Sequence, residues 1–216
     1  FVTVEQILDP SLRGKPVVVG SPPEVRGVVS AASYEARKYG IHSGMPSSRA
    51  YRLCPDAVFV RGSFKRYTEA SRAFKAILDD FTPFTESGGL DEAYLDVTGF
   101  ESLHGSHLEM ARKIKARVLA ETGLVVSIGI ASTRIVAKVA SDYGKPDGLC
   151  DVPPGEEAAF LAPLPVADLP GIGKKTQPVL YRLGIRSIGD LAATGEATLS
   201  SYFGSAGAVM YRHSLG

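Results

Sequence analysis

The sequence predicts an α+β fold, in which a sheet is backed by helices in a ferredoxin-like arrangement and is followed by a helical tail. Short β-branched runs alternate with segments of helical periodicity over residues 1–152, and the strands lie far apart along the chain, as in layered α+β domains. A Pro- and Ala-rich stretch begins near residue 153, and the pattern beyond it is helical. We therefore expect a sheet-containing part first and an all-helical part last.

The N-terminal segment, residues 1–62, predicts a small α/β arrangement. The valine-rich run KPVVVG predicts a short buried strand, and the Pro-Pro turn after it leads to a second strand. The elements expected here are a helix ending near Leu8, strands at 15–20 and 27–33, helices at 34–39 and 47–53, and a strand at 58–62.

Helices and strands alternate again over residues 63–152. Apolar side chains recur at helical spacing over 64–80, and further helices are expected at about 106–122 and at 133–143. The strand LDEAYLDVTG at 90–99 is predicted to pair antiparallel with LVVSIGIAS at 124–132, and a GKPDGL loop follows the last helix.

Two adjacent acids, Asp91 and Glu92, open the LDEAYLDVTG strand. Neighbouring side chains of a strand point to opposite faces, so both acids can reach one ion only if the entering turn rotates one of them. Ser87, Gly88 and Gly89 supply such a turn. Divalent cations such as Mg²⁺ take carboxylate oxygens together with substrate phosphates, so the pair indicates metal-assisted phosphoryl transfer. A solvated hairpin corner is the alternative, because exposed acids are common.

The tail contains LPGIGKKT at 169–176, a glycine turn between two short predicted helices and a helix-hairpin-helix signature. Gly171 and Gly173 allow the backbone to approach a phosphate, while free amides at the second helix, with Lys174 and Lys175, favour an anion. Such contacts position a DNA backbone and do not read bases. The alternative is an ordinary αα-hairpin with two solvated lysines.

Composition narrows the possible classes of protein. The net charge is +1, so any DNA-binding surface must come from local clustering of the 24 Lys and Arg. Cys54 and Cys150 are isolated and no signal-like segment is present, which indicates a reducing, cytoplasmic setting. No apolar run reaches the roughly 18 residues expected of a membrane span.

Together these segments resemble the Y-family of translesion DNA polymerases, most closely those of the bacterial DNA polymerase IV type. The resemblance covers essentially the whole chain, with the motifs in the order found in the family. It implies fingers over 1–62, a palm over 63–152 and a helix-hairpin-helix thumb over 153–216. The matching segments are FVTVEQILDPSLRGKPVVVG, SYEARKYGIHSGMP, LDEAYLDVTG, STRIVAKVASDYGKPDGL and LPGIGKKT.

The resemblance implies roles for particular nucleotide-binding residues. Phe1 matches the aromatic steric gate that rejects a ribose 2′-hydroxyl group. Tyr34 and Arg37 match the fingers pair that holds the incoming triphosphate, and their spacing places them on one helix face. Lys145 matches a lysine that reaches the triphosphate as a point charge.

The implied function is template-directed DNA synthesis, adding deoxynucleotides to a primer 3′ end opposite normal or damaged bases. Asp91 and Glu92 match the metal ligands, and two Mg²⁺ ions would neutralise the triphosphate and activate the primer hydroxyl. Asp96 is expected to be structural. The implied partners are primer–template DNA, deoxynucleoside triphosphates and, for the full-length protein only, a sliding clamp. We expect a monomer in the cytoplasm, associated with the nucleoid.

Three departures from the family pattern accompany the resemblance. The family's remaining catalytic aspartate lies on a strand just upstream of the steric gate, so we expect the chain as given to be an inactive fragment. The family usually has Ser where Gly89 stands. The chain also stops before the family's C-terminal little-finger domain and clamp-binding tail, so weaker DNA binding is expected. A non-catalytic, polymerase-like DNA-binding accessory protein in mutagenic repair is the alternative.

Overall fold

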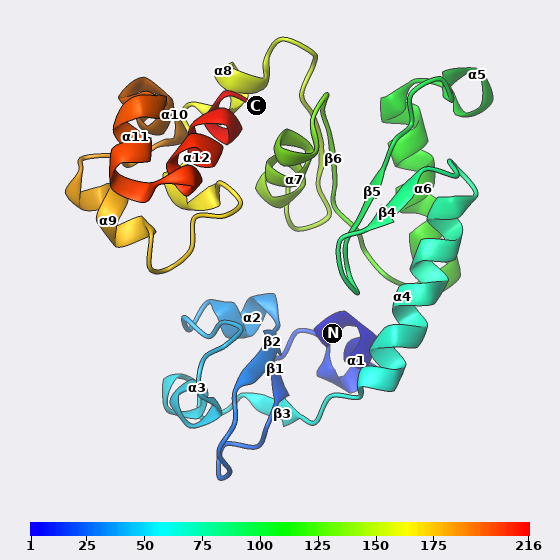
Figure 1. The fold of residues 1–216 in the computed structure, drawn as a ribbon. Helices are drawn as coiled ribbons and strands as arrows, with labels where there is room; N and C mark the ends of the chain where they lie inside the picture. Colours follow the sequence, from blue (N-terminus) through cyan, green and yellow to red (C-terminus); the bar gives the residue numbers. More distant parts are fainter. The chain divides into compact units, whose positions relative to one another are not determined.

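A computed structural model describes all residues from Phe1 to Gly216, and it confirms a fold of mixed helix and sheet (Figure 1). The chain forms two compact units. Unit 1 contains Phe1–Leu95 and Val118–Leu124, and unit 2 contains Asp96–Arg117 and Val125–Gly216. The helix α6 (His107–Thr122) contributes to both. None of the helices combines the length and apolar character that crossing a membrane requires.

Unit 1 contains nearly all the elements that the sequence predicts for it, together with one short strand and one 3₁₀ helix that it does not predict. The helix at 47–53 is found with its predicted bounds, whereas Thr85–Ser87 forms a strand that the pattern did not indicate. The elements are α1 (Val2–Leu8), a 3₁₀ helix (Pro10–Leu12), β1 (Val17–Gly20), β2 (Val29–Ala32), α2 (Tyr34–Arg37), α3 (Ser47–Leu53), β3 (Val58–Val60), α4 (Phe64–Asp79), β4 (Thr85–Ser87) and β5 (Ala93–Leu95).

β1 is the central strand of a three-stranded sheet with the order β2-β1-β3. Val18 lies opposite Ala32 of the antiparallel β2 and opposite Phe59 of the parallel β3. Val18 packs in a core with α2 and α3, while Val17 and Val19 pack in a second core with α1 and α4. Alternate residues of a strand face opposite sides, and burying each valine stabilises the fold by roughly 2 kcal/mol. Figure 1 accordingly shows α2 and α3 on one side of this sheet and α1 on the other.

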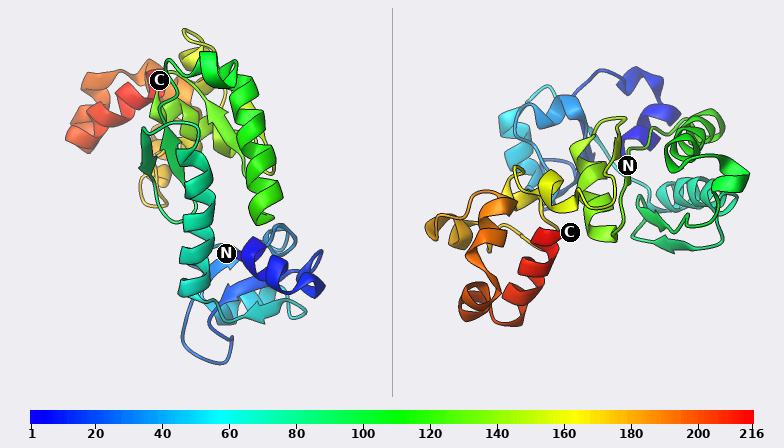
Figure 2. Two further views of the ribbon diagram at one scale, coloured as in Figure 1. Left: turned by 90° about the vertical axis from the view of Figure 1, so that its right-hand side faces the viewer. Right: turned by 90° about the horizontal axis from the view of Figure 1, so that it is seen from above.

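Unit 2 begins with two helices, continues with a strand–helix–strand segment and ends in a run of helices. In its tail α11 and α12 lie side by side (Figures 1 and 2). The strand β7 and the helix α5 were not predicted, because each contains only three or four residues. The elements are α5 (Glu101–His104), α6, β6 (Ile128–Ile130), α7 (Arg134–Tyr143), β7 (Leu149–Asp151), α8 (Glu157–Leu161), a 3₁₀ helix (Val166–Asp168), α9 (Gln177–Arg182), α10 (Ile188–Thr194), α11 (Glu196–Phe203) and α12 (Ser205–Leu215).

The predicted antiparallel pairing of the acidic strand with the 124–132 segment was wrong. β5 pairs antiparallel with β4, its neighbour in sequence, and Glu86 lies opposite Tyr94. β6 pairs parallel with β7, and Ile128 lies opposite Leu149. The 85–87 and 149–151 strands each have only three residues, which is too short for an alternating pattern to reveal them.

Gly129 of β6 lets the strand backbone touch the helix α7. A Cβ atom at Gly129 would lie 2.1 Å from the carbonyl oxygen of Ala137 and 2.4 Å from the amide nitrogen of Ser141. Both atoms belong to helix backbone, so neither can move without disturbing α7. Only glycine therefore fits this position.

Replacing Gly129 with alanine is expected to destabilise the protein by about 2 kcal/mol, because the strand and helix must separate to admit the methyl group. Gly173→Ala serves as the control. A Cβ atom at Gly173 meets no heavy atom within 4 Å, so that change should alter stability by less than about 1 kcal/mol. Urea unfolding followed by circular dichroism measures both, and equal midpoints for the two variants would contradict the close packing described for Gly129.

Candidate active site and glycine hairpin

The acidic pair lies on the turn between β4 and β5. The Gly88 amide donates a 3.0 Å hydrogen bond to the Glu92 carbonyl, which closes the turn, and Asp91 is exposed while Glu92 is half-buried. A Cβ atom on Gly88 would lie 3.6 Å from Glu92 Oε2, and one on Gly89 would lie 3.9 Å from Asp91 Oδ1. The Glu92 carboxylate therefore lies over Gly88, and that of Asp91 lies over Gly89.

Lys75 of α4 holds this turn, a contact that sequence reasoning missed. Its Nζ donates a 2.7 Å hydrogen bond to Ser87 Oγ and another to the carbonyl of Gly89, to which Ser87 Oγ also donates at 3.1 Å. The ammonium group thereby holds Ser87 and Gly89, which lie in the turn that leads into the acidic pair. Lys75 lies on a helix 14 residues before Gly89, and no local pattern marks such a contact.

The acidic turn supplies the ligand chemistry of a divalent cation, but only part of a closed site. The chain contains no group of three or more His, Cys, Asp or Glu side chains arranged to hold a metal ion. Mg²⁺ is commonly bound through one or two carboxylates, with substrate phosphates and water completing its shell. Asp91 and Glu92 therefore fit an ion that arrives with its nucleotide, and not one held permanently by protein ligands.

The ring of Phe1 stacks on the ring of a buried tyrosine, Tyr67. The two ring centroids lie 4.1 Å apart and the ring planes are 7° from parallel. Leu90, the residue before Asp91, packs against the core that contains Val2 and Tyr67. The structure thus places Phe1 and the residue that precedes the acidic pair against the same core of unit 1.

Glu5 fixes the position of the Tyr67 side chain by a hydrogen bond. Tyr67 donates a 2.7 Å hydrogen bond from its hydroxyl to Glu5 Oε1, and Arg66 pairs with Glu5 Oε2 at 3.3 Å. Burial, the hydrogen bond to Glu5 and the charge of Glu5 together raise the pKa of Tyr67 well above its ordinary value. The phenol is therefore a neutral donor at physiological pH, and the ring beneath Phe1 has one orientation.

Tyr34 and Arg37 share one face of α2, as their spacing predicts. The Arg37 guanidinium carbon lies 5.4 Å from the centroid of the Tyr34 ring, and Arg37 Nε donates a 3.1 Å hydrogen bond to the Ala32 carbonyl. Both side chains are exposed. Ser33 caps the helix and also accepts the amide of Val17, which ties α2 to β1. The pair thus presents a phenol and an anchored guanidinium to solvent, and both groups suit phosphate oxygens.

Lys145 lies in unit 2, where it forms an ion pair inside its own segment. Its Nζ lies 2.6 Å from Asp142 Oδ1, and Lys138 Nζ lies 3.2 Å from Asp142 Oδ2. Partial burial alone would raise the pKa of Asp142, but the hydrogen bonds and charges of the two lysines outweigh it and leave the pKa below its ordinary value. Asp142 therefore stays ionised and neutralises part of a lysine pair.

The glycine hairpin of the tail is exposed and has backbone N–H groups without a backbone acceptor. Gly171 adopts φ +96°, and the amides of Gly173, Lys174 and Lys175 donate to no backbone carbonyl. Ile172 is buried between the two glycines and anchors the turn in the core of unit 2. The short helix predicted before the turn is a three-residue 3₁₀ helix, Val166–Asp168. The turn itself has the open amides that an anion requires.

Comparison with sequence models of known families assigns the chain to a family. A sequence model of the impB/mucB/samB family matches residues 1–142. The chain belongs to this family. A second model, described as the IMS family HHH motif, matches residues 154–185 and so covers the glycine hairpin.

A named relative and two solved structures are similar to this chain in sequence and fold. DNA polymerase IV of Dehalococcoides mccartyi strain CBDB1 is 58% identical over 205 residues, which are 95% of this chain and 53% of that protein. The crystal structure of DinB from Sulfolobus solfataricus is similar with a TM-score of 0.90 and 34% identity, over 100% of this chain and 63% of that one. An insertion ternary complex of Dbh DNA polymerase gives a TM-score of 0.87 and 34% identity, over 100% and 64% of the two chains.

These matches confirm the resemblance to Y-family polymerases of the DNA polymerase IV type. The chain spans about half the length of the curated relatives it matches. Within unit 1 the structure contains Phe1, Tyr34, Arg37, Asp91 and Glu92, whereas Lys145 and the hairpin belong to unit 2. The roles of these residues remain predictions.

Proposed function

We propose that this chain is the catalytic part of a Y-family, DNA-directed DNA polymerase. It adds deoxynucleotides to a primer 3′ end opposite normal or damaged template bases. The observation that carries the proposal is the acidic turn, where Glu92 lies over Gly88 and Asp91 over Gly89, with Phe1 and Leu90 against one core. Relatives named DNA polymerase IV support it.

In this proposal each side chain has a task set by its chemistry. Asp91 and Glu92 would hold two Mg²⁺ ions, which neutralise triphosphate charge and help deprotonate the primer hydroxyl when bound. Tyr34 and Arg37 orient the phosphates by hydrogen bonding, and Phe1 excludes the 2′-hydroxyl of a ribonucleotide. Lys145 exchanges Asp142 for a phosphate oxygen of the nucleotide.

The larger organisation belongs to the same proposal. Residues 1–62 form the fingers, 63–152 the palm and 153–216 the thumb. The partners are primer–template DNA and deoxynucleoside triphosphates, with a sliding clamp for the full-length protein. It works as a monomer in the cytoplasm, at the nucleoid, where translesion synthesis and DNA repair take place.

Metal-dependent primer extension tests this function directly. Full-length protein is assayed on a primer–template with Mg²⁺, with EDTA, and beside the 216-residue chain. Extension that requires both the metal and the full-length protein supports the proposal. A folded protein that binds primer–template without extending it would instead favour the non-catalytic accessory protein.

Replacing Lys174 and Lys175 together with alanine is expected to weaken DNA binding equally for all sequences, because the hairpin contacts phosphates only. Each lost phosphate contact should reduce the slope of log K against log salt by about 1, so the double variant loses about 2. Fluorescence anisotropy at several salt concentrations measures the slope. Lys65→Ala/Lys38→Ala is the control, since both lysines are exposed and lie in unit 1. An unchanged slope in the hairpin variant would remove the hairpin from the DNA interface.

A further inference from the structure

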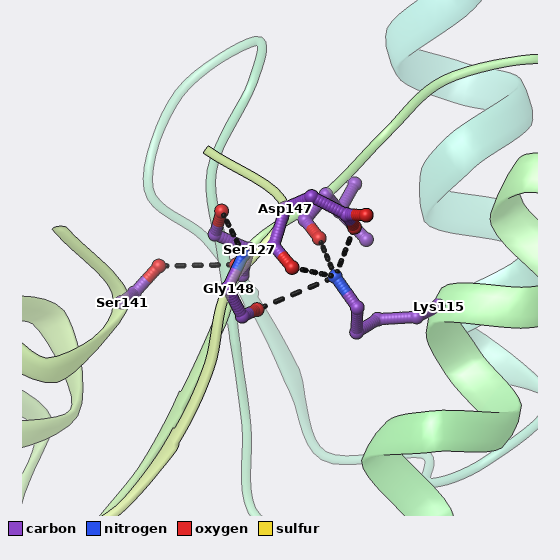
Figure 3. A network of polar contacts seen from close by, with 6 residues as sticks. Lys115, Ser127, Ser141, Asp147 and Gly148 are labelled. Atoms are coloured by element: carbon purple, nitrogen blue, oxygen red, sulfur yellow. Dashed lines mark hydrogen bonds and ion pairs between the residues drawn. The ribbon is translucent and has the colours of Figure 1, made fainter. Parts of the chain in front are cut away.

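The ammonium group of Lys115 ties together three separate backbone groups around one loop. Lys115 projects from α6, and its Nζ donates to the carbonyls of Val126 at 2.5 Å, Asp147 at 3.1 Å and Gly148 at 3.3 Å. It also lies 2.6 Å from the carboxylate oxygen Oδ1 of Asp147. Figure 3 shows the side chain reaching from the helix into this group of oxygens.

The surroundings of Lys115 make these contacts necessary to the fold of the loop. The Lys115 side chain is only 19% exposed, so its ammonium group has exchanged most of its water for protein oxygens. A buried charge without such partners would be costly. Asp147 adopts φ +54°, a conformation that few non-glycine residues take, and its carboxylate and carbonyl both point at the ammonium group. Lys115 therefore helps to hold a turn that its own sequence disfavours.

A second set of hydrogen bonds, made by two serines, also holds this loop. Gly148 donates its amide to Ser127 Oγ at 3.1 Å, and Ser141 of α7 donates its hydroxyl to the Ser127 carbonyl at 3.0 Å. These bonds connect the loop to the segment entering β6 and to α7 (Figure 3). Asp147 and Gly148 are thus clamped by Lys115 and Ser127, and Ser141 holds Ser127 in turn.

This clamped loop carries Lys145, two residues before Asp147. We infer that Lys115 is a positioning residue for nucleotide binding: it fixes the 144–148 loop so that Lys145 is presented to the triphosphate. The inference rests on the proposed polymerase function and adds a residue to it. Lys115 touches neither substrate nor metal in this assignment, because its donors are already used by the loop.

The expected signature is a change in nucleotide affinity without a change in chemistry. In the full-length protein, Lys115→Met keeps the aliphatic stem and removes the ammonium group, so KM for the incoming deoxynucleotide should rise about tenfold while kcat stays within about twofold. Asp147→Asn keeps an acceptor at the same position and should raise KM by about threefold. Lys113→Met is the matched control on the same helix, because Lys113 is exposed and donates to His104, away from the loop. Its KM should equal that of the unaltered protein.

A double-mutant cycle with Lys145→Ala separates positioning from any independent role. If Lys115 acts through Lys145, the Lys115→Met change should raise KM by less than about twofold in the Lys145→Ala background. A full tenfold rise in that background, or an unchanged KM in both Lys115→Met and Asp147→Asn, would overturn the inference while leaving the polymerase intact. Failure of the unaltered protein to extend a primer would overturn both. Asp147→Asn decides the question if Lys115→Met fails to fold in thermal melting.

Discussion

Primer extension by the full-length protein is expected to fall at least about a thousandfold when Asp91 is replaced with alanine. The carboxylate supplies half of the acidic turn, and without it a metal ion bound with the nucleotide loses a charged ligand. A thousandfold loss corresponds to about 4 kcal/mol of transition-state stabilisation, which is within the range for removing a preorganised charge. Because Asp91 is exposed, the variant should fold normally. Single-turnover extension with saturating nucleotide measures the effect.

Asp96→Ala is the matched control, since Asp96 carries the same charge at the other end of the strand. Its Oδ1 accepts the Thr98 amide at 3.0 Å, and hydrogen bonds from the Thr98 side chain and amide lower the pKa of Asp96. We expect a structural role, so activity should change by less than about threefold. Equal losses in the two variants would show that the strand tolerates neither change and would remove the special assignment of Asp91.

Local patterns were sufficient to predict most of the elements and part of the candidate site. The helical spacing of apolar residues gave α4 and α6 to within one residue, because these helices are long and amphipathic. An i, i+3 spacing predicted that Tyr34 and Arg37 share one helix face, and in the structure the Arg37 guanidinium group lies over the Tyr34 ring. Each of these predictions depends on residues that are close in sequence.

Contacts between distant residues could not be predicted in the same way. The hydrogen bond between Tyr67 and Glu5 joins residues 62 positions apart, and Lys115 meets Asp147 across 32 positions. A half-buried lysine on a helix looks, in sequence, like any other charged residue on the solvent face. Its role follows only from the carbonyl oxygens that the fold collects around its ammonium group.

Glu5 illustrates how such a distant contact supports a functional surface. A glutamate in the first helix is usually solvated, yet Glu5 is only 3% exposed and receives both a phenol and a guanidinium group. A buried carboxylate requires partners of this kind, since an unpaired one would cost several kcal/mol. Its partners in turn orient Tyr67, on which the Phe1 ring lies. The stacked pair is therefore held by buried polar bonds and not by ring contact alone.

Replacing Phe1 with alanine is expected to raise the incorporation of ribonucleotides relative to deoxynucleotides by about a hundredfold. The stacked ring would occupy the volume that a ribose 2′-hydroxyl needs, and a steric difference of this size is worth roughly 3 kcal/mol at most. Removing the ring leaves Tyr67 in place, because Glu5 and Gly62 confine it: a Cβ atom on Gly62 would already lie 2.8 Å from the Tyr67 hydroxyl. The space opened by the substitution therefore stays open. The ratio of kcat/KM for paired ribo- and deoxynucleotides measures the change.

Phe64→Ala provides the comparison, because Phe64 is 72% exposed at the start of α4 and forms no part of the stack. It should leave sugar discrimination unchanged. An unchanged ratio in Phe1→Ala, with normal deoxynucleotide insertion, would assign sugar discrimination to another residue. If Phe1→Ala instead lowered deoxynucleotide insertion as strongly as it relaxed discrimination, the ring would be needed to support the sugar as well as to exclude the hydroxyl. The two outcomes therefore distinguish a ring that only excludes the 2′-hydroxyl from a ring that also supports the sugar of the deoxynucleotide.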